Sequence, residues 1–154
     1  MFRFKLQPAL RYREWLEDGK KAVFADRQRA FEREKAKAKA LRESRELYFE
    51  ALRKEASKDE VSITFVNFYH SYIFFLERKI KEQDEAAAEA ARAMAEAYAE
   101  LVEAKKQKEI MVKVREKALH LYKEEEARVE QVSLDDFSMI KHVRTLRGLD
   151  HLTS

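Results

Sequence analysis

Apolar residues recur every three or four positions along most of the chain, which is the spacing of an α-helix that buries one face. Between residues 69 and 132 the steps alternate strictly between four and three for about nine heptads, which is typical of a left-handed coiled coil. The positions on this stripe are Tyr69, Ile73, Leu76, Ile80, Gln83, Ala87, Ala90, Met94, Ala97, Leu101, Ala104, Lys108, Met111, Arg115, Ala118, Tyr122, Glu125, Val129 and Val132. The pattern predicts a long helix that packs against another helix.

A weaker stripe runs through the first half of the chain, at Leu6, Leu10, Leu16, Val23 or Phe24, Ala30 or Phe31, Ala38, Leu41, Tyr48 and Leu52. Between the stripes, Ser57 with Glu60 resembles a capping box, and Ser62 or Thr64 offers a later cap. A short turn there makes the two helices antiparallel neighbours. We therefore expect an all-α fold, a single antiparallel coiled-coil hairpin over residues 1–154. Its parts are a first helix at about 8–57, a turn at about 58–63, a second helix at about 64–140, and a mobile C-terminal tail at about 147–154.

Charge divides the chain into three blocks of alternating sign. Charged residues make up 40% of the sequence, with only two glycines and one proline, a composition that favours long helices. Residues 1–57 hold 16 Lys/Arg against 10 Asp/Glu, residues 58–104 hold 5 against 10, and residues 105–154 hold 11 against 9. Adjacent blocks of opposite sign favour a hairpin in which partner residue numbers add up to about 120. In that register the basic residues Arg33, Lys35, Lys37 and Lys39 face the acidic residues Glu82, Asp84, Glu85 and Glu89.

The two predicted helices differ in length. The N-terminal end of the first helix lies near Leu6, whose partner in the hairpin lies near residue 114. The second helix continues beyond that point for about 20 residues more, roughly 30 Å. This overhang keeps an apolar stripe at Ala118, Leu119, Tyr122, Val129, Val132, Leu134, Phe137 and Ile140. A stripe without a partner in the hairpin favours an external partner. Dimerisation of this end, or a short third helix that folds back, remains the alternative.

An aromatic run, VSITFVNFYHSYIFFLERKI at residues 61–80, stands out in this charged sequence. Its seam positions are Tyr69, Ile73, Leu76 and Ile80, while Phe68, Tyr72 and Phe75 form a second stripe about 100° to one side. A two-helix hairpin cannot cover both flanks of one helix, so we expect some of these rings to be exposed for protein binding. The alternative is a local core at the tip with incidental exposure.

Residues suited to catalysis, or to binding a metal or a cofactor, are not grouped in this sequence. It contains no cysteine, no Gly-rich phosphate loop, no His pair at ligand spacing and no recognisable Ser/His/Asp constellation. We therefore expect no enzymatic activity, no cofactor and no metal. The first ten residues lack the apolar core of a signal peptide, and no stretch reaches the roughly 18 apolar residues of a membrane span. These features predict a cytoplasmic protein without direct membrane insertion.

Three stretches of the sequence resemble the FliJ family of the bacterial flagellar type III export apparatus. The opening FRFKLQPALRYRE is similar to the family's short basic and apolar lead into its first helix. The stretch FYHSYIFFLERKI is similar to the family pattern at the start of the second helix. In EQVSLDDFS, the residues Glu130, Gln131, Leu134 and Asp135 match the family's Glu-Gln-x-x-Leu-Asp-Glu signature, with Asp136 in place of the final Glu. The matches span nearly the whole chain in the family's order.

The resemblance implies a non-enzymatic protein like the central stalk of a rotary ATPase. The free ends of such a hairpin enter the hexameric flagellar export ATPase and promote its assembly and activity, while the protein also contacts export chaperones and the membrane export gate. The resemblance implies that the residues which contact the ATPase are Leu6, Leu10, Ala118, Leu119, Tyr122, Val129, Val132, Leu134 and Phe137. It implies that the residues which contact the gate or chaperones are Phe68, Tyr72, Phe75 and Leu76, of which Leu76 also lies on the seam. The expected location is the cytoplasmic face of the inner membrane at the flagellar base.

Two other functions are compatible with a charged coiled coil. One is a homodimeric scaffold or cytoskeletal protein, which would change mass with concentration and leave any ATPase unaffected. The other is nucleic-acid binding through the basic segment 27–39, which the facing acidic block disfavours. The sequence pattern also does not separate a flagellar protein from a virulence-secretion relative.

Overall fold

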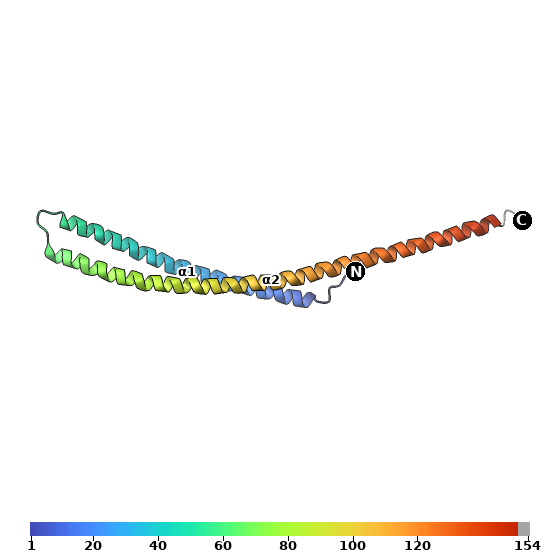
Figure 1. The fold of residues 1–154 in the computed structure, drawn as a ribbon, viewed down its shortest axis with the longest axis horizontal. Helices are drawn as coiled ribbons and strands as arrows, with labels where there is room; N and C mark the ends of the chain where they lie inside the picture. The colour runs from blue at the N-terminus through green and yellow to red at the C-terminus, as the bar shows by residue number, and fades with distance from the viewer. Residues whose placement is uncertain (151–154) are drawn as a thin grey trace. The chain divides into compact units, whose positions relative to one another are not determined.

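The computed structural model consists of two long helices and describes the backbone of residues 1–150 and the side chains of residues 1–144. Helix α1 spans Gln7–Ala56 and helix α2 spans Ile63–Asp150, with no strand in this part of the chain (Figure 1). The all-α fold with a longer second helix is confirmed. Helix α2 continues ten residues past the expected end at 140, and so includes the first four residues of the expected tail 147–154. The remaining tail residues lie outside the described backbone.

Contacts divide the chain into two compact units. Unit 1 comprises Met1–Glu14 and Gln107–Ser154, and unit 2 comprises Trp15–Lys106. Unit 2 therefore contains the turn together with most of α1 and the first half of α2. Unit 1 contains both chain termini, the first turns of α1 and the second half of α2.

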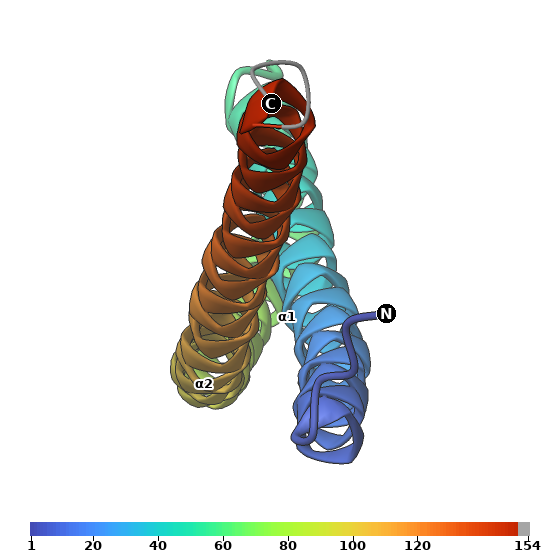
Figure 2. The same cartoon turned by 90° about the vertical axis from the view of Figure 1, so that its right-hand side faces the viewer.

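In unit 2 the two helices lie side by side and run antiparallel (Figures 1 and 2). Cross-helix contacts join Lys20 to Glu100, Phe24 to Tyr98, Glu34 to Gln83, Arg42 to Asp84 and Tyr48 to Tyr72. The partner numbers add up to between 117 and 126 in each of these pairs. The expected register near 120 is therefore confirmed in unit 2.

The core of unit 2 is a single line of side chains along the seam. It contains Ile73, Leu76, Ile80 and Ala97 from α2 and Ala38 from α1, all buried. These α2 residues are separated by threes, fours and their sums, because only that spacing returns a side chain to the same face of a coiled-coil helix. Each fully buried aliphatic side chain contributes about 1.5–3 kcal/mol relative to exposure. Burial of this one line therefore provides most of the stabilisation of the hairpin.

A polar side chain occupies one position of the seam. The Gln83 amide nitrogen of α2 donates to the backbone carbonyl of Glu34 in α1 at 3.1 Å, and also to the Glu34 carboxylate. This hydrogen bond, followed by one from Lys37, lowers the pKa of the Glu34 carboxyl. Since Gln83 makes these bonds in one register only, it favours this alignment of the two helices over a shifted one.

Most surface charges pair within a helix rather than across the seam, contrary to the expected facing rows. Asp84 accepts two hydrogen bonds from Arg42 at 2.7 Å, not from the segment 33–39. Lys37 and Lys39 pair with Glu34 and Glu43 of their own helix, and Glu82 and Glu89 pair with Lys79 and Arg92 of theirs. Residues three or four apart on one helix are closer neighbours than residues on the outer faces of two helices. Exposed pairs of this kind contribute little to stability, because solvent screens them.

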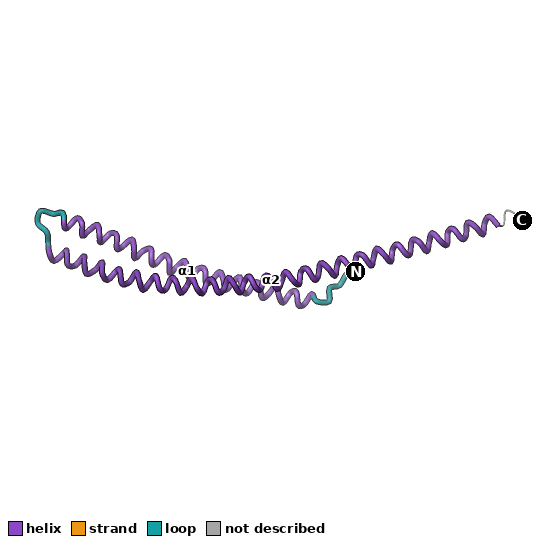
Figure 3. Tube along the Cα trace, in the orientation of Figure 1, coloured by secondary structure: helices purple, strands orange, loops and turns teal. Residues whose placement is uncertain are grey.

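The turn between the helices is organised around a buried carboxylate, Glu55, which is 5% exposed. The Glu55 carboxylate accepts hydrogen bonds from Lys58 Nζ at 2.6 Å and from the Ser62 amide at 3.1 Å (Figure 3 shows the loop). The bond from Lys58, and then that from Ser62, lowers the pKa of Glu55. Ser62 Oγ accepts a long 3.5 Å contact from the Phe65 amide and caps α2, whereas Ser57 Oγ donates to the Lys54 carbonyl at the end of α1. The expected capping box of Ser57 and Glu60 is therefore not formed, and the turn is held instead by the hydrogen bonds to Glu55.

We predict that Glu55→Gln lowers the melting temperature at pH 7 by several degrees. The folded-state pKa of Glu55 is lowered, so its contribution to stability is present above the ordinary value of 4.5. That contribution is lost as the pH falls through the lowered pKa, so the variant and the parent should converge in acid. Thermal melts followed by circular dichroism at pH 7 and near pH 3 test this, with Glu50→Gln, an exposed residue paired with Arg53, as the control. An equal effect of both substitutions at pH 7 would contradict the role of Glu55.

We also predict that Gly19→Ala stabilises the protein by about 0.5–1 kcal/mol. Gly19 lies inside α1 without a positive φ, and a Cβ built on it has no neighbour within 4 Å. The methyl group would therefore lower the entropy of the unfolded chain without a steric clash. Chemical denaturation measures the difference, and a destabilised variant would mean that the space beside Gly19 is needed.

Candidate functional site

An aromatic stripe lies beside the seam of unit 2, on the first turns of α2. Its members are Phe68, Tyr72 and Phe75, which follow one another at steps of four and three. Phe68 stacks on Tyr72 with ring centroids 6.2 Å apart, and Tyr72 contacts Phe75 at 5.8 Å. Tyr72 also packs on Tyr48 of α1 at 4.4 Å, which leaves it partly buried while Phe68 and Phe75 are exposed. The expected second stripe therefore exists and is anchored to α1 through Tyr72.

Leu76 does not belong to this stripe. It is 3% exposed and lies in the seam with Ile73 and Ile80. The reason is the heptad spacing itself, since Leu76 follows Tyr69 by seven positions and so faces the same side of α2. In this folded form Leu76 is therefore part of the seam that holds the hairpin together and is not exposed beside Phe68, Tyr72 and Phe75.

Further apolar side chains are exposed around the turn. Val61, Ile63, Phe65 and Phe74 of the aromatic run are exposed, as is Leu47 of α1. Lys79 Nζ and the Arg78 guanidinium each lie 5.8 Å from the centroid of the Phe75 ring, within the range of a cation–π contact. A seam of two helices leaves these residues uncovered, and together they form an apolar surface with a basic border. Surfaces of this kind commonly bind other proteins.

In unit 1 the first residues form a non-helical arm, residues 1–6, which is extended over residues 1–4 and turns at residues 5 and 6 into α1 (Figure 3). The arm contacts α2 through Met1 and Phe2. Phe2 and Phe4 are partly buried while Arg3 and Lys5 are exposed, the alternation of an extended chain on a surface. Phe2 contacts the Tyr122 ring at 5.5 Å, and the Met1 nitrogen donates to Tyr122 Oη at 2.9 Å. Tyr122 in turn donates to Glu126 at 2.9 Å, which raises the pKa of the phenol.

From the sequence, this segment was expected only as a lead into the first helix, and the unpartnered stripe was expected to begin at Ala118. The arm reaches Tyr122, so Ala118, Leu119 and Tyr122 are all partly buried. The Phe-Arg-Phe-Lys alternation was the signal that could have revealed it. At the start of α1, Leu10 is 1% exposed and so buried, whereas Leu6 is exposed.

Beyond the arm, the second half of α2 carries a broad apolar surface, here called the distal surface. Its members Val129, Val132, Leu134, Phe137, Met139, Ile140 and Val143 are all about half or more exposed. At 100° per residue, Leu134 lies about 140° from Val129, so the expected residues do not share one line. Instead they extend around much of the helix, with Phe137 between them.

The described residues offer no grouping that would hold a metal, since no cluster of three or more His, Cys, Asp or Glu side chains occurs among them. His120 pairs with Glu124 of the next turn at 3.4 Å and is exposed. Over the same part of the chain, no helix is long and apolar enough to cross a membrane. The candidate sites of the described residues are therefore apolar, aromatic and basic surfaces.

These observations define a two-helix antiparallel hairpin whose notable side chains are exposed apolar and aromatic ones. The chain belongs to the FliJ family, described as the flagellar FliJ protein, whose family model matches residues 2–147. It is therefore a component of flagellar type III protein export, and the family is one of non-enzymatic export components. This confirms the resemblance in the three sequence stretches.

Comparison with solved structures supports the fold. A structure from Chlamydia trachomatis, described as that of a YscO homolog, is similar with a TM-score of 0.65 and 21% sequence identity. The alignment covers 92% of this chain and 96% of the other. At that identity the likeness shows a shared fold alone. No curated protein matches the chain.

We predict that Leu76→Ala destabilises the hairpin by about 2–3 kcal/mol, whereas Phe68→Ala changes its stability by less than about 1 kcal/mol. Leu76 is buried in the seam, and its truncation would leave a cavity there. Phe68 is 54% exposed, and its ring contacts are with Tyr69 and Tyr72. Urea denaturation of the two variants tests the assignment. A larger loss for Phe68→Ala than for Leu76→Ala would place the aromatic stripe in the core instead.

Proposed function

We propose that this protein is the central-stalk-like component of the flagellar export ATPase. Unit 1, which contains the arm and the distal surface, inserts into the pore of the hexameric ATPase and promotes its assembly and activity. The protein contributes no chemistry of its own and acts by binding. The observation that carries this proposal is the breadth of the exposed apolar surface in the second half of α2.

Geometry favours a surrounding partner over a second copy of this chain. In a two-stranded coiled coil each helix buries one narrow stripe at the a and d positions. From Met139 to Leu134, the distal surface extends over about 220° of the helix circumference at 100° per residue. A helix with apolar residues over so wide an arc is suited to a pore that contacts it from several sides. This supports the stalk over the homodimeric scaffold, which would need only a single stripe.

Burial of the distal surface would provide enough free energy for a specific complex. Each exposed Val, Leu, Ile or Phe side chain that becomes fully buried contributes about 1.5–3 kcal/mol before the costs of association. Several such residues, with Phe137 the most exposed of the phenylalanines outside the tip, can offset an association cost of about 4–15 kcal/mol. Leu6 on the arm, which belongs to the same unit, is also exposed and would contribute a further contact with the ATPase.

For the turn of unit 2 we propose a second role, as the contact surface for the export gate and export chaperones. Phe68, Tyr72 and Phe75 are pre-ordered by their ring contacts and by Tyr48, so little side-chain entropy would be lost on binding. The proposed location is accordingly the cytoplasmic face of the inner membrane at the flagellar base, reached through protein contacts. Nucleic acid is not a proposed partner, since acidic residues such as Asp84 and Glu100 lie beside the basic ones.

The stalk proposal predicts that Val129→Ser with Phe137→Ser abolishes stimulation of the organism's own flagellar export ATPase. The side chains are 58% and 71% exposed, so the helix should stay folded while its partner contact weakens. Hydrolysis rate and hexamer fraction are measured with and without the protein. The matched control is Phe65→Ser with Phe74→Ser at the turn, where the side chains are 55% and 72% exposed. The control should stimulate the ATPase as the parent protein does.

Two results would contradict the stalk. Equal stimulation by the parent protein and the Val129/Phe137 variant would locate the contact elsewhere. No stimulation by the parent protein, together with a mass that doubles with concentration, would favour the homodimeric scaffold. Circular dichroism of each variant confirms that helicity is retained.

A further inference from the structure

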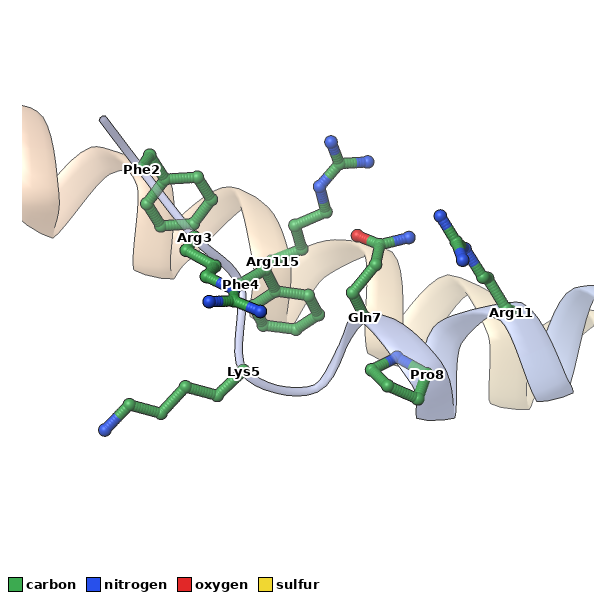
Figure 4. A pocket seen from close by; sticks show the side chains of 8 residues that line it. All are labelled: Phe2, Arg3, Phe4, Lys5, Gln7, Pro8, Arg11 and Arg115. Atoms are coloured by element: carbon green, nitrogen blue, oxygen red, sulfur yellow. The ribbon is translucent and has the colours of Figure 1, made fainter.

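A cleft lies between the arm, the start of α1 and the second half of α2, all within unit 1. Its volume is about 550 Å³, and it is lined by Phe2, Arg3, Phe4, Lys5, Gln7, Pro8, Arg11 and Arg115 (Figure 4). Volumes of this order are common for sites that hold a small ligand or a short peptide segment. None of the lining residues is acidic, so the cleft is basic and aromatic.

The four basic side chains of the cleft share a lining without any acidic residue. Some basic side chains elsewhere have a carboxylate partner and others do not. Arg29, Arg42, Arg92 and Arg128 each pair with a carboxylate. Arg3, Lys5, Arg11 and Arg115, by contrast, make no ion pair with any carboxylate in residues 1–144, and all four are exposed. Four uncompensated charges within one cleft produce a local positive potential that attracts an anionic partner.

Two neighbouring features contribute to the character of the cleft. The first turn of α1 contains no acidic residue, so the positive end of the helix dipole is not neutralised by its own chain. The rings of Phe2 and Phe4 line the same cleft and place apolar area beside the cations.

The arrangement of the donors fits an extended acidic chain better than a compact anion. Figure 4 shows Arg115, Gln7 and Arg11 extending in the same direction from two helices, while Lys5 points away. A phosphate group would need donors that converge on one point, whereas these donors are spread along the cleft. A run of carboxylates on a peptide presents charges at intervals, and guanidinium groups bind carboxylates in a two-pronged geometry.

We propose that this cleft binds an acidic segment of a partner protein, in which Asp or Glu side chains pair with Arg11 and Arg115, and with Arg3 on the arm. The acidic segment would be supplied by the export ATPase around unit 1, and this identification of the partner rests on the proposed function. The cleft adds a salt-dependent contact to the apolar contact of the distal surface, and fixes the rotation of the helix within its partner.

The first test uses the full-length protein and a short fluorescent poly-Glu peptide, and so does not depend on the ATPase. Arg11→Gln with Arg115→Gln should weaken peptide binding about tenfold at low ionic strength, because two charged contacts are lost. The matched control is Arg29→Gln with Arg92→Gln, which removes the same charge from exposed sites on the same two helices. The control should bind within about twofold of the parent. Added salt should reduce the difference between the variants.

Three results with the peptide would overturn the proposal. The first is no peptide binding by the parent protein. The second is an equal loss of binding in both double variants, which would indicate an effect of net charge alone. The third is displacement of the bound peptide by inorganic phosphate or ATP at lower concentrations than by free poly-Glu. A second test then measures stimulation of the export ATPase by the same variants. Normal stimulation by the Arg11/Arg115 variant would exclude the ATPase as the source of the acidic segment. If the parent protein does not stimulate the ATPase, the proposed stalk function is rejected, while the result of the peptide test still stands.

Discussion

The narrowness of a two-helix seam determines almost everything else about this protein. Two packed helices enclose one line of side chains, here centred in unit 2 on Ile73, Leu76 and Ile80. Within unit 2, which the structure describes in full, no third element covers the outer faces, so large apolar side chains off that line, among them Phe68 and Phe74, stay exposed. A larger domain could bury Phe68 and Phe74 in its interior, but this fold cannot. The abundance of charged residues on the remaining faces compensates for this exposure by keeping the chain solvated.

Specific polar contacts set the register that the apolar line alone leaves loosely defined. A heptad stripe can shift by seven residues and still bury apolar side chains, particularly where the contacts are alanines. Gln83 bonded to Glu34 crosses the seam and fixes the observed alignment, while Glu55 bonded to Lys58 and Ser62 fixes the path of the turn from which that alignment starts. Surface ion pairs add little to this choice, because most of them form within one helix.

The sequence was sufficient to predict what depends on period alone. The strict four-three steps predicted the long coiled-coil helix and the seam position of Leu76, and the short turn near residue 60 predicted the hairpin and its register near 120. Period could not predict the partner of Asp84, since several basic residues lie within reach across a coiled coil and side-chain length decides among them. It also could not predict Glu55, whose partners depend on the path of the loop. The arm was missed because the alternation at Phe2 and Phe4, although it indicates an extended segment, does not show which part of α2 that segment contacts.

The two candidate surfaces differ in physical character, and this difference suits them to different partners. At the turn, Phe68, Tyr72 and Phe75 form a pre-ordered aromatic surface whose binding depends on apolar area and should change little with salt. In unit 1, apolar side chains around α2 are combined with the unpaired charges of Arg11 and Arg115, so binding there should weaken as ionic strength rises. Apolar burial is non-directional, whereas charge pairs are specific in position. A helix held in a pore by apolar contacts alone would be free to rotate, and a basic cleft on one side is what would give it a defined orientation.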